Sequence, residues 1–525
     1  MIRINQIKVN ALYNTKDNII NSICKKLKIK KENIKKINIY KQSLDARDKN
    51  NIIFVYEVDA IVDNEKDILK KHKDVFLSPD TTYQFQKNGN IKLTHNPVII
   101  GSGPAGLFCA YFLALNGYNP IIIERGEKVE DRVKTVNVFW KENKLNVNSN
   151  VSFGEGGAGT FSDGKLNTLV KDKKNMIKKV YELFVKFGAN EDIMYSYKPH
   201  IGTDVLVNIV KNMRNEIIRL GGKFHYNSCL TNLNIENNHI KSIIINNQYK
   251  IDCNVLILAI GHSARDTYKM LYDSKLNMES KPFAIGVRVE HSQDMINESQ
   301  YGLIYKDVLP NAPYKLTYKS SNKRGVYSFC MCPGGYVVNA SSSNGCLAIN
   351  GMSYSDRNSK NANSAIVVTV TQEDFGLNPL DAIKYQIELE KKTYNVGNGK
   401  IPIQLLKDFK NNTISKSFDG LNPKIKGSYT FSNLNEIFPE SILFSLKESF
   451  KYFGTKIKGF DNDNTILSAI ETRTSSPVRI TRDDNLESNI KGIYPCGEGA
   501  GYAGGIVSSA MDGIRVAEKI AFKYK

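Results

Sequence analysis

The clearest pattern of apolar and polar positions lies between residues 96 and 124. Val98–Ile100 is a short apolar run typical of a buried parallel strand, and Ile121–Ile123 is a second one. Between these runs, apolar residues recur with helical spacing from Leu107 to Leu115, and Gly117 follows the last of them. This order predicts two parallel strands joined by a buried helix.

The turn before this helix contains three glycines in the spacing G-x-G-x-x-G, at Gly101, Gly103 and Gly106. In such a unit the first glycine permits a tight turn, the second lets the backbone approach a pyrophosphate, and the third lets helix and strand pack closely. The helix N-terminus favours an anion. Glu124, at the end of the second strand, is placed to accept hydrogen bonds from ribose hydroxyls. The segment therefore predicts a dinucleotide site.

The same stretch resembles a membrane span in hydropathy, because residues 96–123 contain no charged side chain. Its first third is interrupted by glycines and Pro104, and its last third by Asn116-Gly117 and Pro120. The uninterrupted apolar run is too short to cross a bilayer. We predict a buried helix and no membrane span.

A second glycine-rich stretch covers residues 150–166 and has five glycines within eleven positions. Such a segment can adopt positive φ and bring its backbone close to a flat or anionic group. Phe153 and Phe161 favour burial against a ligand over a flexible surface loop. Ligand contacts are expected from this stretch and from the polar helix before it, at Arg132, Gly157, Gly159, Thr160 and Ser162.

A third segment of this kind lies at the far end of the chain. Residues 493–506 form an apolar strand and a glycine-rich turn, and they lead into a small-residue helix at 507–522. A flavin needs such a pair, because one βαβ unit holds its AMP half and a distant segment holds the ribityl and isoalloxazine groups. Glu498 is expected to accept from ribityl hydroxyls. The N–H groups of Gly504–Ile506 are expected to face the ring and stabilise its anionic reduced form.

The remaining apolar pattern divides the chain into four parts. Residues 1–92 predict a small α+β domain and residues 93–265 the first part of the nucleotide-binding domain. Residues 266–465 predict an inserted, mainly antiparallel substrate or cap domain, and residues 466–525 complete the nucleotide-binding domain. The predicted fold class is α/β: a Rossmann-like domain with an inserted mixed β-rich domain and a small N-terminal α+β domain.

Local signals place some elements within these parts. Ser43–Arg47, between two expected strands, is interpreted as a solvated turn. Ser263, after the buried strand at Val255–Ile260, is a candidate N-cap. In the inserted domain we expect strands at Phe283–Glu290, Val326–Cys332, Tyr336–Ala340 and Ala365–Val370, and a helix at Pro379–Lys392.

The net charge of +19 raises the question of an anionic partner. Residues 25–41 contain eight lysines against one acid, Glu32, in the basic N-terminal part. An RNA-binding surface is one interpretation of this run. A solvated face is favoured, because the aromatic residues that stack on RNA bases are sparse among the lysines.

The eight cysteines are scattered without a C-x-x-C pair, so neither a zinc cluster nor a thioredoxin-like redox pair is indicated. Cys330-Met-Cys332 is too close-spaced to imply a metal site, and no metal is expected. The first ten residues lack the apolar core of a secretory signal. We therefore expect a cytoplasmic protein with reduced thiols.

Two sets of motifs resemble those of known protein families. VIIGSGPAG with IIIERG, and YPCGEGAGYAGGI near the end, resemble the two-segment FAD fingerprint of glutathione-reductase-fold flavoproteins. NVSFGEGGAGTFSDGKLNT, LAIGHSARDTY, FAIGVRVEHSQ and TRTSSPVRI resemble the uncharacterised FAD-dependent dehydrogenase family, often labelled NAD(P)/FAD-dependent oxidoreductases. These motifs run from about residue 93 to the end, and a basic α+β unit before them is typical of the family. The family's reaction is not established.

The resemblance implies FAD as the cofactor. It places FAD contacts at Gly101, Gly103, Gly106, Glu124, Gly497 and Glu498, and it places the backbone of Leu230 near adenine. With the residues beside these motifs, the expected contacts also include Ser102, Pro104, Ala105, Arg125, Gly261, Gly505 and Ile506.

The leading hypothesis is an FAD-dependent oxidoreductase acting on a small-molecule substrate under the inserted domain. Outside the glycine-rich stretches already assigned to the flavin, the chain has no further G-x-G-x-x-G, and it has no C-x-x-x-x-C, so NAD(P)H would have to dock transiently, or a redox partner protein would donate the electrons. An RNA-associated flavoprotein and a flavin-binding protein without turnover are the alternatives. Candidates for a charge near the flavin or an anionic substrate are His262, Lys165, Arg473 and Arg479.

Overall fold

A computed structural model describes residues 1–525. A five-stranded parallel sheet in the order β24-β11-β5-β6-β7 organises the nucleotide-binding part. The central strands β5 and β11 are short, fully buried apolar runs, as expected for a parallel sheet covered by helices, whereas the edge strand β7 is mostly polar and exposed. The predicted Rossmann-like α/β class is confirmed. The strands are β5 (Val98–Ile100), β6 (Ile121–Ile123), β7 (Lys223–His225), β11 (Leu256–Leu258) and β24 (Ile493–Pro495).

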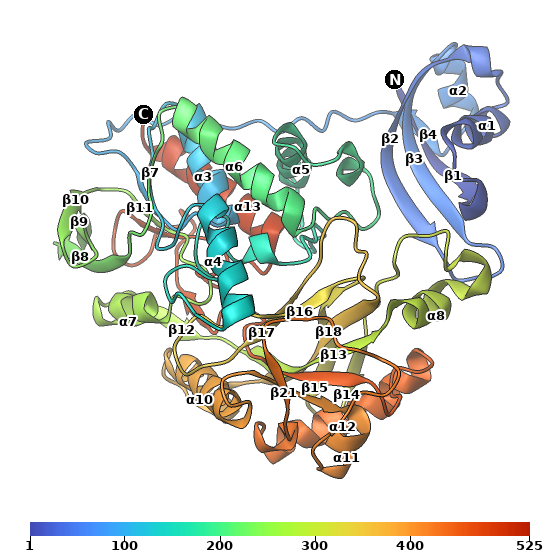
Figure 1. Ribbon diagram of the computed structural model, residues 1–525. Helices are drawn as coiled ribbons and strands as arrows, with labels where there is room; N and C mark the ends of the chain where they lie inside the picture. Colours follow the sequence, from blue (N-terminus) through green and yellow to red (C-terminus); the bar gives the residue numbers. More distant parts are fainter.

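Two helices from distant parts of the chain pack together against this sheet. Helix α3 (Pro104–Leu115) follows β5, and helix α13 (Ile506–Lys523) follows β24. They lie side by side in Figure 1, and a Cβ on Gly513 would lie 2.2 Å from the carbonyl oxygen of Ala105. This close approach requires glycine at that position of α13. The helix predicted between β5 and β6 is buried from Ala105 to Ala114, and no helix has the length and apolarity to cross a membrane.

Further helices and a small antiparallel sheet complete this part of the fold. Strands β8, β9 and β10 form an antiparallel meander beside α7. The N-cap of α7 is Ala264, so the prediction that Ser263 caps this helix is wrong. The elements are α4 (Val129–Glu142), α5 (Met176–Lys186), α6 (Thr203–Arg219), β8 (Leu230–Glu236), β9 (His239–Ile245), β10 (Tyr249–Asp252) and α7 (Arg265–Asp273).

The inserted domain is built on a seven-stranded sheet in the order β14-β15-β18-β13-β22-β19-β21. All of its pairs are antiparallel except β19 with β21. Strand β22 pairs with β13 and β19, although the sequence placed residues 466–525 with the nucleotide-binding domain. The strands are β13 (Phe283–Ser292), β14 (Thr317–Lys319), β15 (Gly325–Cys332), β18 (Asn361–Val370), β19 (Ile401–Leu405), β21 (Tyr429–Phe431) and β22 (Ile466–Glu471).

Smaller elements border this sheet and connect it to the parallel sheet. Strand β12 pairs with β23, and β17, β16 and β20 form a three-stranded sheet. Helices α8, α10 and α12 lie around the large sheet in Figure 1. The elements are β12 (Met278–Ser280), α8 (Gln293–Tyr305), β16 (Tyr336–Asn339), β17 (Ile349–Met352), α9 (Gln372–Phe375), α10 (Asp381–Val396), α11 (Leu406–Asn411), β20 (Ile425–Lys426), α12 (Glu440–Lys456) and β23 (Val478–Ile480).

The N-terminal part is an antiparallel sheet in the order β2-β3-β1-β4 with two helices. One cluster of buried apolar side chains continues from it into the inserted domain, and Asn10 Nδ2 donates to the Tyr305 hydroxyl across the junction. The turn predicted at Ser43–Arg47 is wrong in its first half, because β2 continues to Asp45. The elements are β1 (Ile2–Asn10), α1 (Lys16–Leu27), β2 (Ile34–Asp45), β3 (Ile53–Val62), α2 (Glu65–Lys71) and β4 (Val75–Leu77).

The lysines of the run at residues 25–41 are exposed or half-buried. Half of its eight lysines are ion-paired within the domain, which agrees with a solvated face. The pairs are Lys26 with Asp74, Lys31 with Asp17, Lys35 with Asp63 and Lys41 with Glu57.

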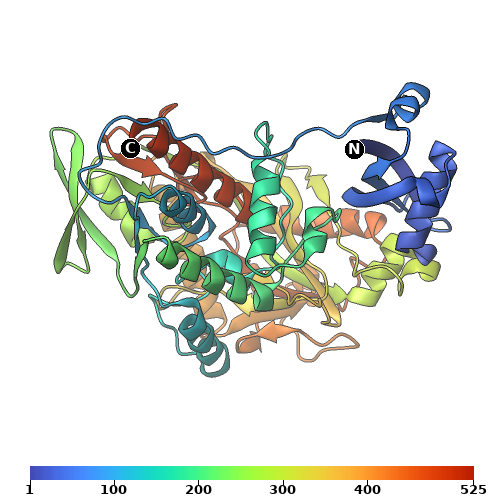
Figure 2. The same ribbon diagram turned by 90° about the horizontal axis from the view of Figure 1, so that it is seen from above.

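A long connection without helix or strand, residues 78–97, leads from the N-terminal part to β5. It crosses the nucleotide-binding part next to α13 (Figure 2). Gly89 N–H donates to the carbonyl of Ala521 at 2.9 Å, and the Tyr83 hydroxyl donates to Glu518 at 2.7 Å. These contacts attach the connection to the C-terminal helix of the chain.

Candidate functional site

The turn between β5 and α3 has the backbone shape that its glycines predict. Gly101 has φ +95°, and a Cβ there would lie 2.3 Å from the carbonyl oxygen of Ala259. A Cβ on Gly106 would lie 2.0 Å from the carbonyl oxygen of Gly101. Gly103 is the N-cap of α3 and Pro104 its first residue, so no side chain caps the first N–H groups of the helix. The helix therefore begins with free donors at an open turn.

Glu124 connects three segments at this turn. Its Oε2 accepts from the N–H and the hydroxyl of Ser102, at 2.9 and 2.7 Å. Its Oε1 accepts from the N–H of Gly126 at 2.9 Å and of Gly154 at 3.1 Å. A carboxylate offers about four acceptor positions, and the chain itself fills four of them. Glu124 therefore holds the turn against the second glycine-rich stretch, and its contact with a ribose stays a prediction.

The second glycine-rich stretch is held by a fully buried arginine on α4. Arg132 donates to the backbone carbonyls of Asn150, Val151, Gly154, Glu155 and Gly157, at 2.8 to 3.2 Å. Gly154, Gly156 and Gly157 have positive φ, and a Cβ on Gly157 would lie 2.9 Å from the Cα of Gly103. Arg132 therefore fixes the loop against the start of α3.

The C-terminal segment adds a second open helix start. Gly505 is the N-cap of α13 and, like Gly103, provides no side-chain cap. Asp512 lies in the second turn of this helix. Its carboxylate accepts from Gly497 N–H at 2.8 Å and from Arg482 at 2.7 and 2.9 Å. Sequence reasoning missed Asp512, although an acid among the apolar and small residues at the start of this helix was a usable signal.

A cavity of about 370 Å³ opens at the carboxyl ends of β5, β6 and β11. Both helix starts lie on its wall, and ligands bind at this edge of open α/β sheets. Phe329 and Cys330 of β15 and Asn350 of β17 close it from the inserted domain. The cavity thus joins segments that are up to four hundred residues apart in the sequence.

Most of the predicted site residues line this cavity. They are Gly101, Ser102, Gly103, Pro104, Ala105, Glu124, Arg125, Gly157, Gly159, Ser162, Lys165, Leu230, Gly261, His262, Arg473, Glu498, Gly504, Gly505 and Ile506. Gly106, Arg132, Thr160, Gly497 and Arg479 lie outside its wall.

The residues outside the cavity wall pack against other parts of the protein. Gly106 and Gly497 are packed against backbone and Ala105, and Thr160 is buried behind the loop. The guanidinium of Arg479 lies over the Tyr502 ring, 5.2 Å from its centre, so Arg479 is withdrawn as a catalytic candidate. Phe161, expected to bury a ligand, packs edge-on against Trp140.

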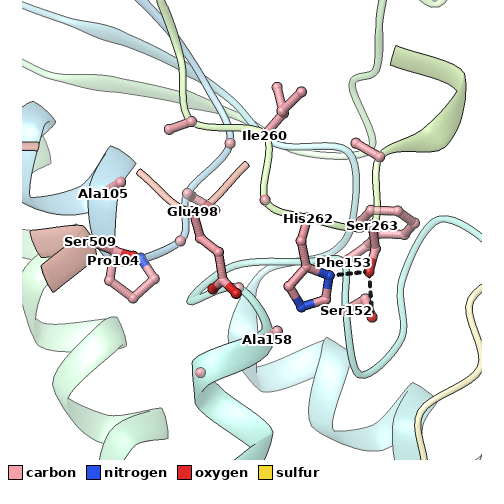
Figure 3. A pocket seen from close by; sticks show the side chains of 18 of the residues that line it. Pro104, Ala105, Ser152, Phe153, Ala158, Ile260, His262, Ser263, Glu498 and Ser509 are labelled. Carbon is pink, nitrogen blue, oxygen red and sulfur yellow. Dashed lines mark hydrogen bonds between the residues drawn. The ribbon is translucent and has the colours of Figure 1, made fainter. Parts of the chain in front are cut away.

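His262 enters the cavity from the turn after β11. Figure 3 shows its ring beside Ser263 and Ser152. Nδ1 lies 2.8 Å from the Ser263 hydroxyl, which donates to Ser152 at 3.4 Å. Burial, and then the charge of Arg473, lower the pKa of His262 to about 4. The imidazole is therefore neutral at neutral pH.

Arg473 is held behind this histidine by an acid of the inserted domain. Its guanidinium donates to both carboxylate oxygens of Glu390, at 3.0 and 2.9 Å, and Arg265 donates to the same two oxygens. Burial opposes ionisation, but the two guanidinium groups hold the pKa of Glu390 well below its usual range. Arg473 also donates to Ser342 at 2.6 Å. Through its pair with Glu390, Arg473 joins α10 to the nucleotide-binding part.

Lys165 also lines the cavity and donates to the carbonyl of Met331 on β15. Asp163 is 3.7 Å away and also accepts from Arg357. Burial works against the ammonium charge, but Asp163 raises the pKa of Lys165. A cation therefore lies beside the strand that closes the cavity.

Glu498 has the most informative titration. Its desolvation in the cavity raises its pKa to about 7, against the opposing charge of Lys281. A folded-state pKa above the unfolded value means that ionising Glu498 costs stability as pH rises through 7. We expect Glu498→Gln to raise the melting temperature of the FAD-free chain more at about pH 8 than at about pH 5. Thermal denaturation of both chains at both pH values measures this, and an equal difference would contradict the assignment.

Family models match three parts of the chain. Residues 282–474 match a model described as "FAD-dependent protein, C-terminal domain-like". Residues 99–155 match an NAD(P)-binding Rossmann-like domain, and residues 1–61 match a domain of unknown function. The first match spans the seven-stranded sheet that closes the cavity, and the second contains the glycine turn before α3.

An uncharacterised protein of Clostridium beijerinckii is 47% identical over 100% of this chain and 99% of its own length. Among solved structures, E. coli quinol fumarate reductase is 10% identical with a TM-score of 0.37, over 82% of this chain and 70% of that one. Glycine oxidase from Bacillus cereus is 11% identical with a TM-score of 0.33, over 82% and 98%. The full-length likeness to the Clostridium protein shows that the two chains belong to one family.

Proposed function

Since the chain belongs to a family of FAD-dependent proteins, we propose that it is an oxidoreductase that binds FAD in this cavity and passes a hydride or electrons between a donor and a small-molecule substrate. The observation that carries the proposal is that two helices from opposite ends of the sequence begin, without side-chain caps, on one cavity. The inserted sheet closes the same cavity, which leaves a place for a substrate.

The residues present fit FAD. Free N–H groups and the helix dipole at Gly103 suit a pyrophosphate, and those at Gly505 suit the electron-rich edge of a flavin ring. A Cβ on Gly504 or on Gly261 would meet no heavy atom within 4 Å, so the backbone there borders open space. Leu230 lines the end of the cavity next to Glu124, where adenine is expected.

FAD, when bound, supplies reversible acceptance of two electrons. The neutral imidazole of His262 has Nδ1 beside the Ser263 hydroxyl, so its Nε2 is the atom that can exchange a proton with a ligand. Lys165 keeps its positive charge and can attract an anionic group of the substrate. Arg473, paired with Glu390, orients the serines around His262.

We expect NADH or NADPH to reduce the bound flavin on a catalytic timescale, since a nicotinamide is the common hydride donor to FAD. The chain has a single dinucleotide-binding turn, and its fingerprint is the one assigned to FAD, so the nicotinamide docks only transiently. Anaerobic stopped-flow mixing with each nicotinamide measures the loss of flavin absorbance. Slow or absent loss with both would contradict a nicotinamide donor, and a reduced redox partner protein is then the next donor to test.

A further inference from the structure

Strand β15 carries two cysteines at the point where it closes the cavity. Its pairing with β18 is interrupted between Phe329 and Cys332, so the strand contains a bulge. Cys330 lies in this bulge with φ +43°, an uncommon value for a residue other than glycine. Bulges beside active sites re-aim a side chain. Here the bulge brings Cys330 to the cavity wall, while Cys332 is fully buried behind it.

The two thiols are within reach of each other. Cys332 Sγ lies 3.2 Å from the carbonyl oxygen of Cys330, to which it donates. In a regular strand, residues two apart are about 6.6 Å apart, near the upper end of the Cα separations that a disulfide spans, and the bulge at Cys330 departs from that regular geometry. The cavity wall therefore carries one cysteine, Cys330, with the thiol of Cys332 behind it.

The surroundings of Cys330 favour a thiolate. Arg288 donates to its carbonyl at 3.2 Å, and Lys165 donates to the carbonyl of the next residue. A hydrogen bond from Cys332, and then these two cations, hold the pKa of the Cys330 thiol well below its usual range. The same contact raises the pKa of Cys332. One thiolate and one thiol, with the thiolate facing the cavity, is the arrangement that redox-active pairs use.

We propose that Cys330 and Cys332 are a dithiol–disulfide pair that exchanges two electrons with FAD bound in this cavity; the inference rests on the proposed function. On oxidation, a bond forms between the two Sγ atoms, the Cys332 thiol gives up its one proton, and the two electrons and that proton reduce FAD to its anionic reduced form. In reverse, two electrons from the reduced FAD break that bond, and one proton restores the Cys332 thiol beside the Cys330 thiolate. The substrate class that this pair implies is a thiol or a disulfide compound, which undergoes thiol–disulfide exchange with Cys330.

Reductive titration of the FAD-loaded full-length chain tests the pair. The air-oxidised wild type is expected to take up four electrons per FAD from dithionite, two for FAD and two for the disulfide. Cys330→Ser and Cys332→Ser are expected to take up two. Cys24→Ser, on α1 in the N-terminal part, is the matched control and is expected to take up four. Melting temperatures of all four chains establish that each is folded.

Mass spectrometry after alkylation gives a second readout. In the oxidised chain Cys330 and Cys332 are expected to resist alkylation until dithiothreitol is added, and their peptide is two hydrogens lighter. An FAD-loaded wild type that takes up two electrons, with both cysteines alkylated in air, overturns the pair and leaves the proposed function intact. A folded chain that binds no FAD overturns both.

Discussion

Gly103→Val is expected to weaken FAD binding by about 100-fold, because forcing a side chain into a filled site costs about 1–3 kcal/mol. Gly103 has an extended backbone that valine also adopts, and its Cβ would meet only the Cα of Gly157, at 3.7 Å. The added methyl groups therefore enter the cavity rather than the protein. Titration of the FAD-free chain with FAD, followed by flavin fluorescence, measures the change.

Gly325→Val is the matched control for this substitution. Gly325 begins β15 outside the cavity, and its Cβ would meet Thr369 Oγ1 at 3.4 Å. It is expected to leave FAD affinity unchanged. Equal affinities of Gly103→Val and wild type would show that the turn before α3 does not contact the cofactor.

Arg132→Met is expected to lower the free energy of unfolding by about 3–5 kcal/mol and to abolish FAD retention. Methionine fills much of the space but offers no donor to the five backbone carbonyls that Arg132 satisfies. Those buried acceptors lose their partners, and the glycine-rich loop loses its position against Gly103. Denaturant unfolding and flavin content after gel filtration measure both effects.

Arg219→Met controls for the loss of a charge. Arg219 is on the exposed end of α6 and pairs only with Glu216. Surface pairs of this kind contribute about 0–1 kcal/mol, so a small change is expected. If Arg132→Met retained the wild-type free energy of unfolding and the flavin, the hydrogen bonds from Arg132 to the glycine-rich loop would not stabilise the protein or the site.

The sequence predicted the elements whose signals are local. The strand, glycine turn and helix from Val98 to Leu115 follow from apolar spacing and from the steric needs of a tight turn, and the structure has each of them. The same holds for the glycine turn before α13. In both cases the residues that determine the conformation lie within one short stretch.

The residues that hold the site together were harder to predict because their partners are remote in sequence. Glu390 pairs with Arg265 and Arg473, which precede and follow the inserted domain in the sequence, and no local pattern marks Glu390. Arg132 was expected to touch the ligand, but its burial and its hydrogen bonds to the glycine-rich loop make it part of the scaffold. Cys330 needed the bulge, which sequence spacing does not show.

The claim at the centre is that distant segments form one FAD site. The flavin content of the purified full-length chain, measured after incubation with FAD and gel filtration, tests it most directly. We predict one FAD per chain, released on denaturation and greatly reduced in Gly103→Val. A folded wild-type chain that elutes colourless after this incubation would contradict the account.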